Sequence, residues 1–470
     1  MARSATSQYS IGLHFGLESV RVVVVDIRTG RIARQTSQDY AHGVIDQSLP
    51  GSGARLPSGY ALQHPRDWLD AASAACRQAM LESDATADQV IGIGVAFTSC
   101  TILPCQADGT PLCLTEKFKN VPLAWPKLPT HRTAMAEADR MNAIAQEQKE
   151  PWLARYGGII GIDWFFPKML ETLNHEPATF DAAAVWVEGG DWLVWQLIDG
   201  PYPSCKADSV IRSICQAGFK ALWNNQSGYP PRAYFEAVHP KLDIAVETTF
   251  TGILQRPGSS AGELTEASAK LLGLKPGITV SSAIIDSHAI VPGAGVAAPS
   301  TLVMVMGERP SLLMNSRIEA IPPGVAGVVE DGILEGYIGY EIRDSSVGNA
   351  LTDEPSMEAA AFRIRSLCDA FRDAGVPVRR FVAVGDLPEK SPQMMQIYAD
   401  VLDARIKLAA SDQPIALGAA ILGCIAADSG HASISQAIHA MAPERKHPIY
   451  RPDLRARRRY DELYEKHRPH

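Results

Sequence analysis

The chain has 470 residues and 46% of them are hydrophobic, which is enough to bury more than one core, so we expect two large domains. Its 44 basic and 52 acidic residues give a net charge of -8. This balance excludes the positive surface that nucleic acids and anionic membranes attract. The N-terminus lacks a signal-peptide core, and no run reaches the roughly 18 apolar residues of a membrane span. We therefore expect a cytoplasmic protein with small-molecule partners. The oligomeric state is left open, a homo-oligomer included.

The N-terminal elements are predicted as a strand pair followed by a helix. Residues 11–16 (I-G-L-H-F-G) and the valine-rich residues 20–26 are typical of a β-hairpin with its turn near Gly16. Further along, Pro65 suits the first turn of a helix. Four apolar residues then recur at helical spacing and predict one buried face: Leu69, Ala72, Cys76 and Met80.

A lone carboxylate at the end of an apolar run is the most informative feature of the middle of the chain. Residues 284–295 read I-I-D-S-H-A-I-V-P-G-A-G, which predicts a buried strand ending at Asp286. An acid at the exit of a buried strand is delivered to a cleft, so Asp286 is the leading candidate for a catalytic base. His14 and His288 are candidate partners for acid–base chemistry, because imidazole titrates near neutral pH.

The second half of the chain repeats the plan of the first. Residues 301–314 predict a strand, a glycine turn and a second strand, residues 358–371 a helix, and residues 380–386 a strand with a tight turn. The alternation predicts an α/β fold with two related lobes around a cleft. Proline, glycine and serine cluster at residues 254–262, where we expect the boundary. The expected lobes are residues 1–254, with most of the ligand pocket, and residues 255–470, with Asp286.

Cysteine usage argues against a metal or disulfide framework. Eight cysteines are scattered without a C-x-x-C pair and without histidines at zinc spacing. We expect reduced thiols in the core and predict no metal site.

Six segments resemble, in order and spacing, the ribulokinase branch of the FGGY carbohydrate kinases. They read H-G-V-I-D-Q-S-L-P, A-L-Q-H-P-R-D-W, I-G-I-G-V-A-F-T-S-C-T-I-L-P, A-G-F-K-A-L-W, I-I-D-S-H-A and G-Y-I-G-Y-E. The resemblance covers nearly the whole chain and implies the actin-like (ribonuclease H-like) two-lobed fold with a central cleft. It also implies that Asp286 deprotonates the attacking sugar hydroxyl, and that Lys220, Glu341 and the backbone near Ser99 line a ketose pocket. A carboxylate can take up the proton of a hydroxyl group, and carboxylate and ammonium groups can orient a sugar by hydrogen bonds.

The first phosphate turn departs from the resemblance. An aspartate at the end of the first strand holds Mg²⁺ through water in these enzymes, and here the position is His14. Magnesium prefers oxygen ligands, whereas neutral imidazole suits softer metals. The turn that follows Gly16 offers Leu17 in place of a hydroxyl residue, so one phosphate donor is missing.

Two later motifs on the donor side also depart. The second phosphate loop reads Gly307, Glu308, Arg309, Pro310, in which Pro310 lacks an N–H group. The Glu308 charge beside a polyphosphate costs roughly 3 to 4 kcal/mol per charge pair at about 4 to 5 Å with an effective dielectric near 20. At Gly385 the nucleotide turn continues with Asp386, whose Cβ and charge oppose close approach of ATP.

The frame around the donor side is otherwise similar to the family. The A-S-D-Q-P-I-A-L-G-A-A-I segment resembles the later nucleotide-site strand and helix, so Gly16, Gly307, Gly385 and Gly418 are expected to mark a remnant nucleotide site. A tryptophan-rich insert of the family is missing, because S-S-V-G-N runs almost directly into E-A-A-A-F-R.

These observations leave three hypotheses open. The leading one is a protein that binds a ketose, a polyol or a similar small molecule and has impaired or lost ATP-dependent phosphorylation. The second is a repurposed enzyme that uses Asp286, with His14 or His288, for acid–base chemistry without ATP. The third is an active ATP:pentulose phosphotransferase with unusual donor contacts, for which ATP and Mg²⁺ would be cofactors. A scaffolding role of the two-lobed shape overlaps the first.

Overall fold

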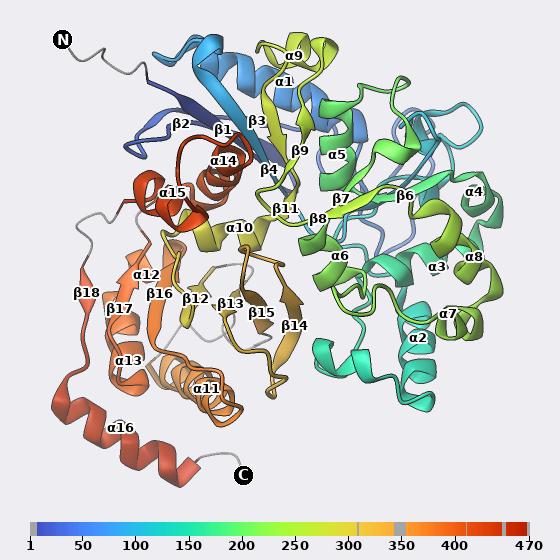
Figure 1. Cartoon of the computed structure of the whole chain (residues 1–470). Coiled ribbons are helices and arrows are strands. Elements are labelled where there is room, and N and C mark those ends of the chain that lie inside the picture. Colours follow the sequence, from blue (N-terminus) through green and yellow to red (C-terminus); the bar gives the residue numbers. More distant parts are fainter. Residues whose placement is uncertain (1–6, 308–309, 343–353, 410, 444–447, 468–470) are drawn as a thin grey trace, which may run out of the picture.

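Two large mixed sheets form the frame of the molecule. The computed structural model describes residues 7–307, 310–342, 354–409, 411–443 and 448–467 (Figure 1). The first sheet has the strand order β3-β2-β1-β4-β10-β9, with β11 also paired to β4. Its strands are β1 (Tyr9–Phe15), β2 (Ser19–Asp26), β3 (Ile32–Asp39), β4 (Val90–Phe97), β9 (Ser260–Glu263), β10 (Thr279–Ser281) and β11 (Ile284–Ile285).

The predicted N-terminal hairpin is confirmed. Strands β1 and β2 pair antiparallel, and the Gly16 N–H group donates to the Ser19 carbonyl at 2.9 Å to close the turn. On its other side β1 runs parallel to β4. The valines of β2 are buried from Val22 to Val25, as expected for a strand covered on both faces.

The second sheet has the strand order β14-β15-β13-β12-β16-β17-β18. The predicted hairpin at residues 301–314 is confirmed as β12 and β13, and β12 runs parallel to β16. The strands of this sheet are β12 (Thr301–Val305), β13 (Ser311–Ser316), β14 (Val325–Glu330), β15 (Ile338–Ile342), β16 (Arg380–Val384), β17 (Ile406–Leu408) and β18 (Ile449–Tyr450).

The sheets do not divide at residue 254, where the boundary was expected. Strands β9, β10 and β11 all follow that position and still hydrogen-bond within the first sheet. The second sheet begins only at Thr301. Proline and glycine at residues 254–262 indicate a loop, and a domain boundary can lie in a loop. These residues do not determine which sheet the next strand joins.

Helix α14 (Pro414–Ala426) joins the two halves through backbone contacts. Three glycines of β1 and β4 lie directly beneath it. A Cβ added at Gly12 would come within 1.8 Å of the Ala416 carbonyl oxygen, and one added at Gly94 within 1.7 Å of the Ala419 oxygen. Only glycine permits this approach. Helix α14 belongs by sequence to the C-terminal half, and it packs on the first sheet and beside α10 (Figure 1).

The remaining helices cover the sheets or form a region beside them. The region on the right of Figure 1 holds two short strand pairs, β5 (Ile102–Cys105) with β6 (Val185–Glu188) and β7 (Ile211–Ser213) with β8 (Ile253–Gln255). Other helices are α1 (Pro65–Leu81), α2 (Met135–Glu147), α3 (Phe165–His175), α4 (Pro177–Ala182), α5 (Gly189–Ile198), α6 (Ile214–Lys220), α7 (Arg232–Val238), α8 (Pro240–Thr249), α9 (Glu266–Leu272), α10 (Asp286–Gly293), α11 (Glu354–Asp373), α12 (Asp386–Lys390), α13 (Pro392–Leu402), α15 (Ile434–Met441) and α16 (Leu454–His467).

The expectations for the cysteines and for the membrane agree with the structure. All eight cysteines are buried and free, and burial raises the pKa of Cys76 to about 12, so its thiol is unreactive at neutral pH. Among the described residues, none of the helices combines the length and the apolar character that crossing a membrane requires.

Candidate active site

The candidate site lies at the carboxyl edge of three neighbouring parallel strands. In the register of β1, β4 and β11, Phe15 pairs with Phe97 and Ile285 also pairs with Phe97. Gly16, Ser99 and Asp286 therefore follow the ends of adjacent strands at one edge of the sheet. Ligands of open α/β sheets bind at this edge.

Asp286 is the first residue of α10, so the strand that delivers it is shorter than expected. Its carboxylate Oδ1 accepts a hydrogen bond from the Ser287 N–H group at 2.7 Å, which orients the side chain. Asp286 is partly exposed, while His288, two residues later, is fully buried. The carboxylate is thus held by its own helix and remains accessible to a ligand.

Lys220 and Glu341 form an ion pair that joins the two halves of the chain. Lys220 is the last residue of α6 and Glu341 lies in β15; the ammonium group donates to both carboxylate oxygens at 2.8 Å. Burial opposes the charge of Lys220, but the adjacent carboxylate more than offsets it and holds the pKa of this lysine above its usual value. The Trp164 ring centre lies 5.5 Å from the ammonium group, within cation–π range.

His288 extends this pair toward Asp286. Its Nε2 atom lies 3.6 Å from a carboxylate oxygen of Glu341, and its Nδ1 atom lies 3.3 Å from the Ser287 hydroxyl. The ring packs on Phe219. The structure therefore brings Lys220 and Glu341 into contact, and His288, two residues after Asp286, lies beside Glu341.

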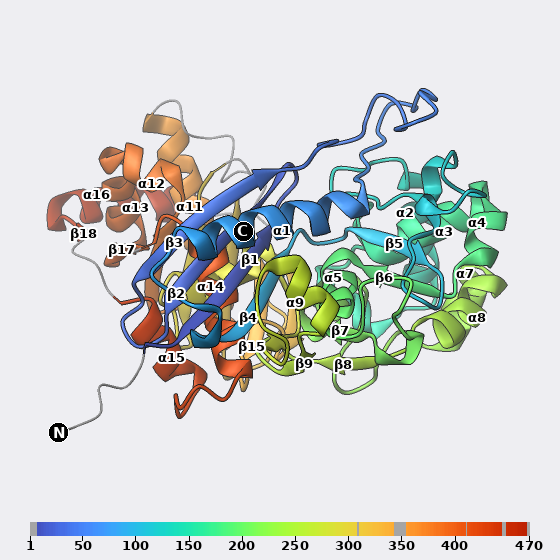
Figure 2. The same cartoon turned by 90° about the horizontal axis from the view of Figure 1, so that it is seen from above.

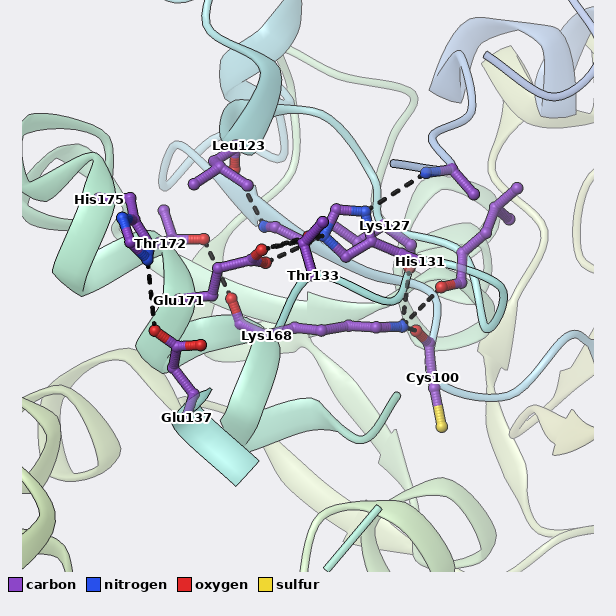
Figure 3. A network of polar contacts seen from close by, with 12 residues as sticks. Cys100, Leu123, Lys127, His131, Thr133, Glu137, Lys168, Glu171, Thr172 and His175 are labelled. Atoms are coloured by element: carbon purple, nitrogen blue, oxygen red, sulfur yellow. Dashed lines mark hydrogen bonds and ion pairs between the residues drawn. The ribbon is translucent and has the colours of Figure 1, made fainter. Parts of the chain in front are cut away.

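The Ser99 turn is held by a lysine that the sequence did not single out. Cys100 adopts a left-handed backbone conformation with φ of 58°. The fully buried Lys168 donates to the Cys100 carbonyl at 2.6 Å and to the Leu128 carbonyl at 2.7 Å (Figure 3). A charged residue inside the apolar run F-F-P-K-M-L was the available signal, because a buried lysine needs partners.

Behind Lys168 lies a second buried polar group. His131 Nε2 contacts Glu171 at 3.0 Å, and Thr133 donates to the same carboxylate (Figure 3). Thr133 and Glu171 meet the same ring nitrogen of His131. A hydroxyl–imidazole–carboxylate catalytic triad needs its two partners on opposite nitrogens, so this group serves to support the pocket wall.

The first turn holds a histidine that is neutral and buried. Burial, with a smaller contribution from the Arg21 charge, lowers the pKa of His14 to about 3. Burial likewise lowers the pKa of His288 to about 4, although Glu341 acts in the opposite direction. Neither imidazole titrates near neutral pH, so the structure does not support the expected acid–base role of His14 or His288. In the same turn, the Leu17 carbonyl accepts a hydrogen bond from Gln63 at 2.5 Å.

A pocket lies at the ends of β16 and β17, with a cavity volume of ≈ 130 Å³. Its lining is mainly polar, and Gly385 lies in it with φ of 113°, where a Cβ would clash with the Met306 carbonyl oxygen at 2.2 Å. Asp386 lines the mouth, but its side chain is 82% exposed and pairs with Lys390 at 3.0 Å, so its charge opposes an anion less than the sequence suggested. Gly307 has open space around it, and Pro310 is partly exposed. Glu308 and Arg309 lie outside the described residues, as does the predicted site of the missing insert.

Gly418 has a different role from the one expected. It lies inside α14, and a Cβ there would come within 1.9 Å of the Ala289 carbonyl oxygen of α10. The glycine is required by close packing of the two helices and does not line the pocket at β16 and β17.

The two depressed histidine pKa values each contribute an acid-dependent loss of stability. Between about pH 6.5 and pH 4 the unfolded chain binds protons at these positions and the folded chain does not, so this contribution to the free energy of unfolding falls as the pH is lowered. Each histidine contributes about 1.4 kcal/mol per pH unit in this range. We expect His14→Gln to reduce that slope by about this amount. Urea unfolding of both proteins at several pH values measures it, and an unchanged slope would show that His14 is protonated in the folded state.

Comparisons with known proteins agree with this geometry. The profile of the FGGY family of carbohydrate kinases, C-terminal domain, matches residues 356–427. A ribulokinase of Shouchella clausii (strain KSM-K16) is 36% identical over 537 aligned residues, covering 98% of this chain and 94% of that protein. A ribulokinase of Mycolicibacterium smegmatis is 34% identical, covering 91% and 87%.

The chain belongs to the FGGY family of carbohydrate kinases. Solved structures confirm the expected fold: a xylulose kinase from Rhodospirillum rubrum has a TM-score of 0.74 at 18% identity and covers 98% of this chain and 97% of its own. A kinase from Brucella ovis, titled a xyloylose kinase, has a TM-score of 0.75 at 17% identity and covers 98% of both chains. The actin-like, two-lobed sugar-kinase fold of the family is therefore present.

Kinases of this family use ATP and Mg²⁺, and the residues on the donor side fit this ligand in part. The pocket at β16 and β17 includes apolar groups of Pro388, Leu408 and Pro414 that could pack on a nucleoside base. The described residues that line it include three carboxylates, Asp386, Glu389 and Asp412, and no basic side chain. At the end of β1 lies the neutral imidazole of His14, whereas Mg²⁺ prefers oxygen ligands.

Proposed function

We propose that this protein is a sugar kinase whose acceptor is a ribulose-like pentulose. The observations that support this function are Asp286 at the carboxyl edge of the first sheet and the ion pair of Lys220 with Glu341, which His288 contacts from the same helix as Asp286. The relatives with 34% to 36% identity over nearly the whole chain are ribulokinases, which favours a pentulose over other sugars.

Asp286, Lys220 and Glu341 each have a role that their chemistry allows. Asp286 accepts the proton of the sugar hydroxyl that becomes phosphorylated, as a positioned general base. Lys220 donates hydrogen bonds to ligand oxygens, and Glu341 accepts them from ligand hydroxyls. The Ser99 turn, held by Lys168, presents backbone groups to the same ligand. Because the ion pair fixes both side chains in advance, the ligand meets a preorganised pocket.

The nucleotide enters this proposal only as the source of the phosphoryl group. When bound, ATP with Mg²⁺ supplies that group and the charge neutralisation that its transfer needs. The lining of the pocket at β16 and β17 would hold the nucleoside.

A coupled assay of ATP consumption tests this function. We expect ADP release that depends on ribulose or xylulose and disappears in Asp286→Ala. ATP consumption without a pentulose, or unchanged consumption in the variant, would contradict the proposal.

The neutral His14 favours a second candidate, a ketose-binding protein in which phosphoryl transfer is impaired. Thermal shift separates the two functions, because any ligand of the folded state raises its apparent stability. A kinase should be stabilised by a pentulose and also by ATP with Mg²⁺ at sub-millimolar concentration. The binding protein should respond to the pentulose alone. We do not expect His14→Asp by itself to restore transfer, because Leu17 and Pro310 remain in the phosphate turns.

A further inference from the structure

Two histidines and a buried aspartate meet where β3 ends and α1 begins. His42 Nδ1 lies 2.9 Å from Asp67 Oδ1 and 3.1 Å from Asp67 Oδ2, and His64 Nδ1 lies 3.9 Å from Asp67 Oδ1. One ligand atom from each residue lies within 4.8 Å of the other two. Asp67 is 6% exposed, while His42 lies at the surface, so the group is reachable from solvent on one side.

The atoms of this group are of the type that transition metals select. Two imidazoles and one carboxylate suit Zn²⁺, Co²⁺ and Ni²⁺, whereas Mg²⁺ and Ca²⁺ prefer oxygen alone. His64 Nδ1 accepts a long hydrogen bond of 3.3 Å from the Arg66 N–H group as the N-cap of α1, so its lone pair faces the start of the helix and the ring has to turn before it ligates an ion.

We propose that His42, His64 and Asp67 bind a divalent transition metal ion, with Zn²⁺ as the representative ligand. The Asp67 oxygen lies 2.9 and 3.9 Å from the two Nδ1 atoms, and all three ligand atoms lie within 4.8 Å of one another, so a small inward movement would place them around one ion at about 2.0 to 2.2 Å. The exposed His42 ring, stacked on His64 with centroids 4.5 Å apart, needs to turn for its lone pair to converge. Three protein ligands leave a coordination position for water.

The position of the group in the fold gives the metal a structural consequence. Residues 42 and 64 lie near the two ends of the long connection between β3 and α1, which extends away from the sheet in Figure 2. A metal ion would close this connection as a loop and reduce the freedom of the unfolded chain. Gln63, next to His64, donates to the Leu17 carbonyl, so the bound metal ion would also stabilise the turn between β1 and β2.

One feature opposes tight binding. His64 is the N-cap of α1, and the N-terminus of a helix carries a partial positive charge. Asp67, in the first turn, compensates for this charge, and we therefore expect a moderate affinity.

Calorimetric titration of the chelator-treated full chain with Zn²⁺ tests the site. We expect one saturable equivalent per chain and a higher unfolding temperature, with Co²⁺ giving the visible absorption of a nitrogen-ligated ion. Mg²⁺ should give neither. His64→Asn keeps a capping side chain on α1, so its effect does not come from loss of the helix. This variant and His42→Gln should each weaken Zn²⁺ binding at least about tenfold, the lower end of what even an outer-sphere partner contributes.

His175→Asn provides the matched control, because His175 also lies beside a carboxylate, that of Glu137 at 3.4 Å, and is exposed. We expect wild-type Zn²⁺ affinity in this variant. Absence of a saturable equivalent in the wild-type protein would overturn the proposal, as would wild-type binding in both His42→Gln and His64→Asn. Equal loss in His175→Asn would also overturn it, because the effect would then belong to surface histidines in general.

Discussion

Asp286→Asn should lower the rate of pentulose-dependent ATP consumption by about 10² to 10⁴-fold, the range of a positioned general base. The amide keeps the shape of the side chain and can still accept the hydrogen bond from the Ser287 N–H group, so the fold should be preserved. It cannot take up the proton of the sugar hydroxyl. Ribulose should still raise the unfolding temperature of the variant, because Lys220 and Glu341 are unchanged.

Asp181→Asn is the matched control for this experiment. Asp181 is half exposed and pairs with Lys241 on the surface, far in sequence from the candidate site, so its loss should leave the rate unchanged. A rate in Asp286→Asn within a few-fold of wild type would remove Asp286 from the mechanism. Loss of both the rate and the ribulose-induced stabilisation would instead assign Asp286 to binding.

Lys220→Met should destabilise the protein by about 3 kcal/mol and abolish ribulose binding. The variant leaves the Glu341 carboxylate, whose side chain is 20% exposed, without its ammonium partner. Breaking a buried pair on one side costs more than the pair contributes, because one charge remains uncompensated. Urea unfolding measures the stability, and thermal shift with ribulose measures the binding.

The double variant Lys220→Met with Glu341→Gln separates these two effects. Removing both charges should recover part of the stability, since no uncompensated carboxylate remains, but ribulose binding should stay lost. Lys241→Met breaks the exposed pair with Asp181 and should cost less than about 1 kcal/mol. Equal costs for Lys220→Met and Lys241→Met would show that the Lys220 pair behaves as a surface pair.

The parts of the fold that local pattern determines could be predicted from the sequence. The valine run before Asp26 and the repeated strand–glycine–strand plan at residues 301–314 depend on neighbouring residues, and both hairpins are confirmed. The helix at residues 358–371 lies within α11 for the same reason. The resemblance of the pocket segments pointed to Asp286, Lys220 and Glu341, and the structure places Lys220 and Glu341 in contact.

Features that depend on long-range packing could not be predicted in this way. Strands β9 to β11 follow the boundary predicted at residue 254 and still pair within the first sheet, and strand partners far apart in sequence leave no local pattern. The sequence around Gly418 is compatible both with a nucleotide motif and with a helix contact, and only the position of α10 in the structure shows the contact. Asp386 pairs with Lys390 at the surface, which reduces the repulsion between its carboxylate and an anion. The sequence motif does not indicate this ion pair. The His42 group joins residues from separate segments, so spacing alone did not indicate it.

Helix α14 connects the pocket at β16 and β17 to Asp286, the proposed general base. Pro414, at its first turn, lines the pocket, and Gly418, one turn later, touches the backbone of the helix that begins with Asp286. In a backbone-to-backbone contact no side chain can change its rotamer to absorb a movement. Helices α14 and α10 are therefore expected to move together. A displacement of α14 by an incoming nucleotide would therefore also move the helix that begins with Asp286.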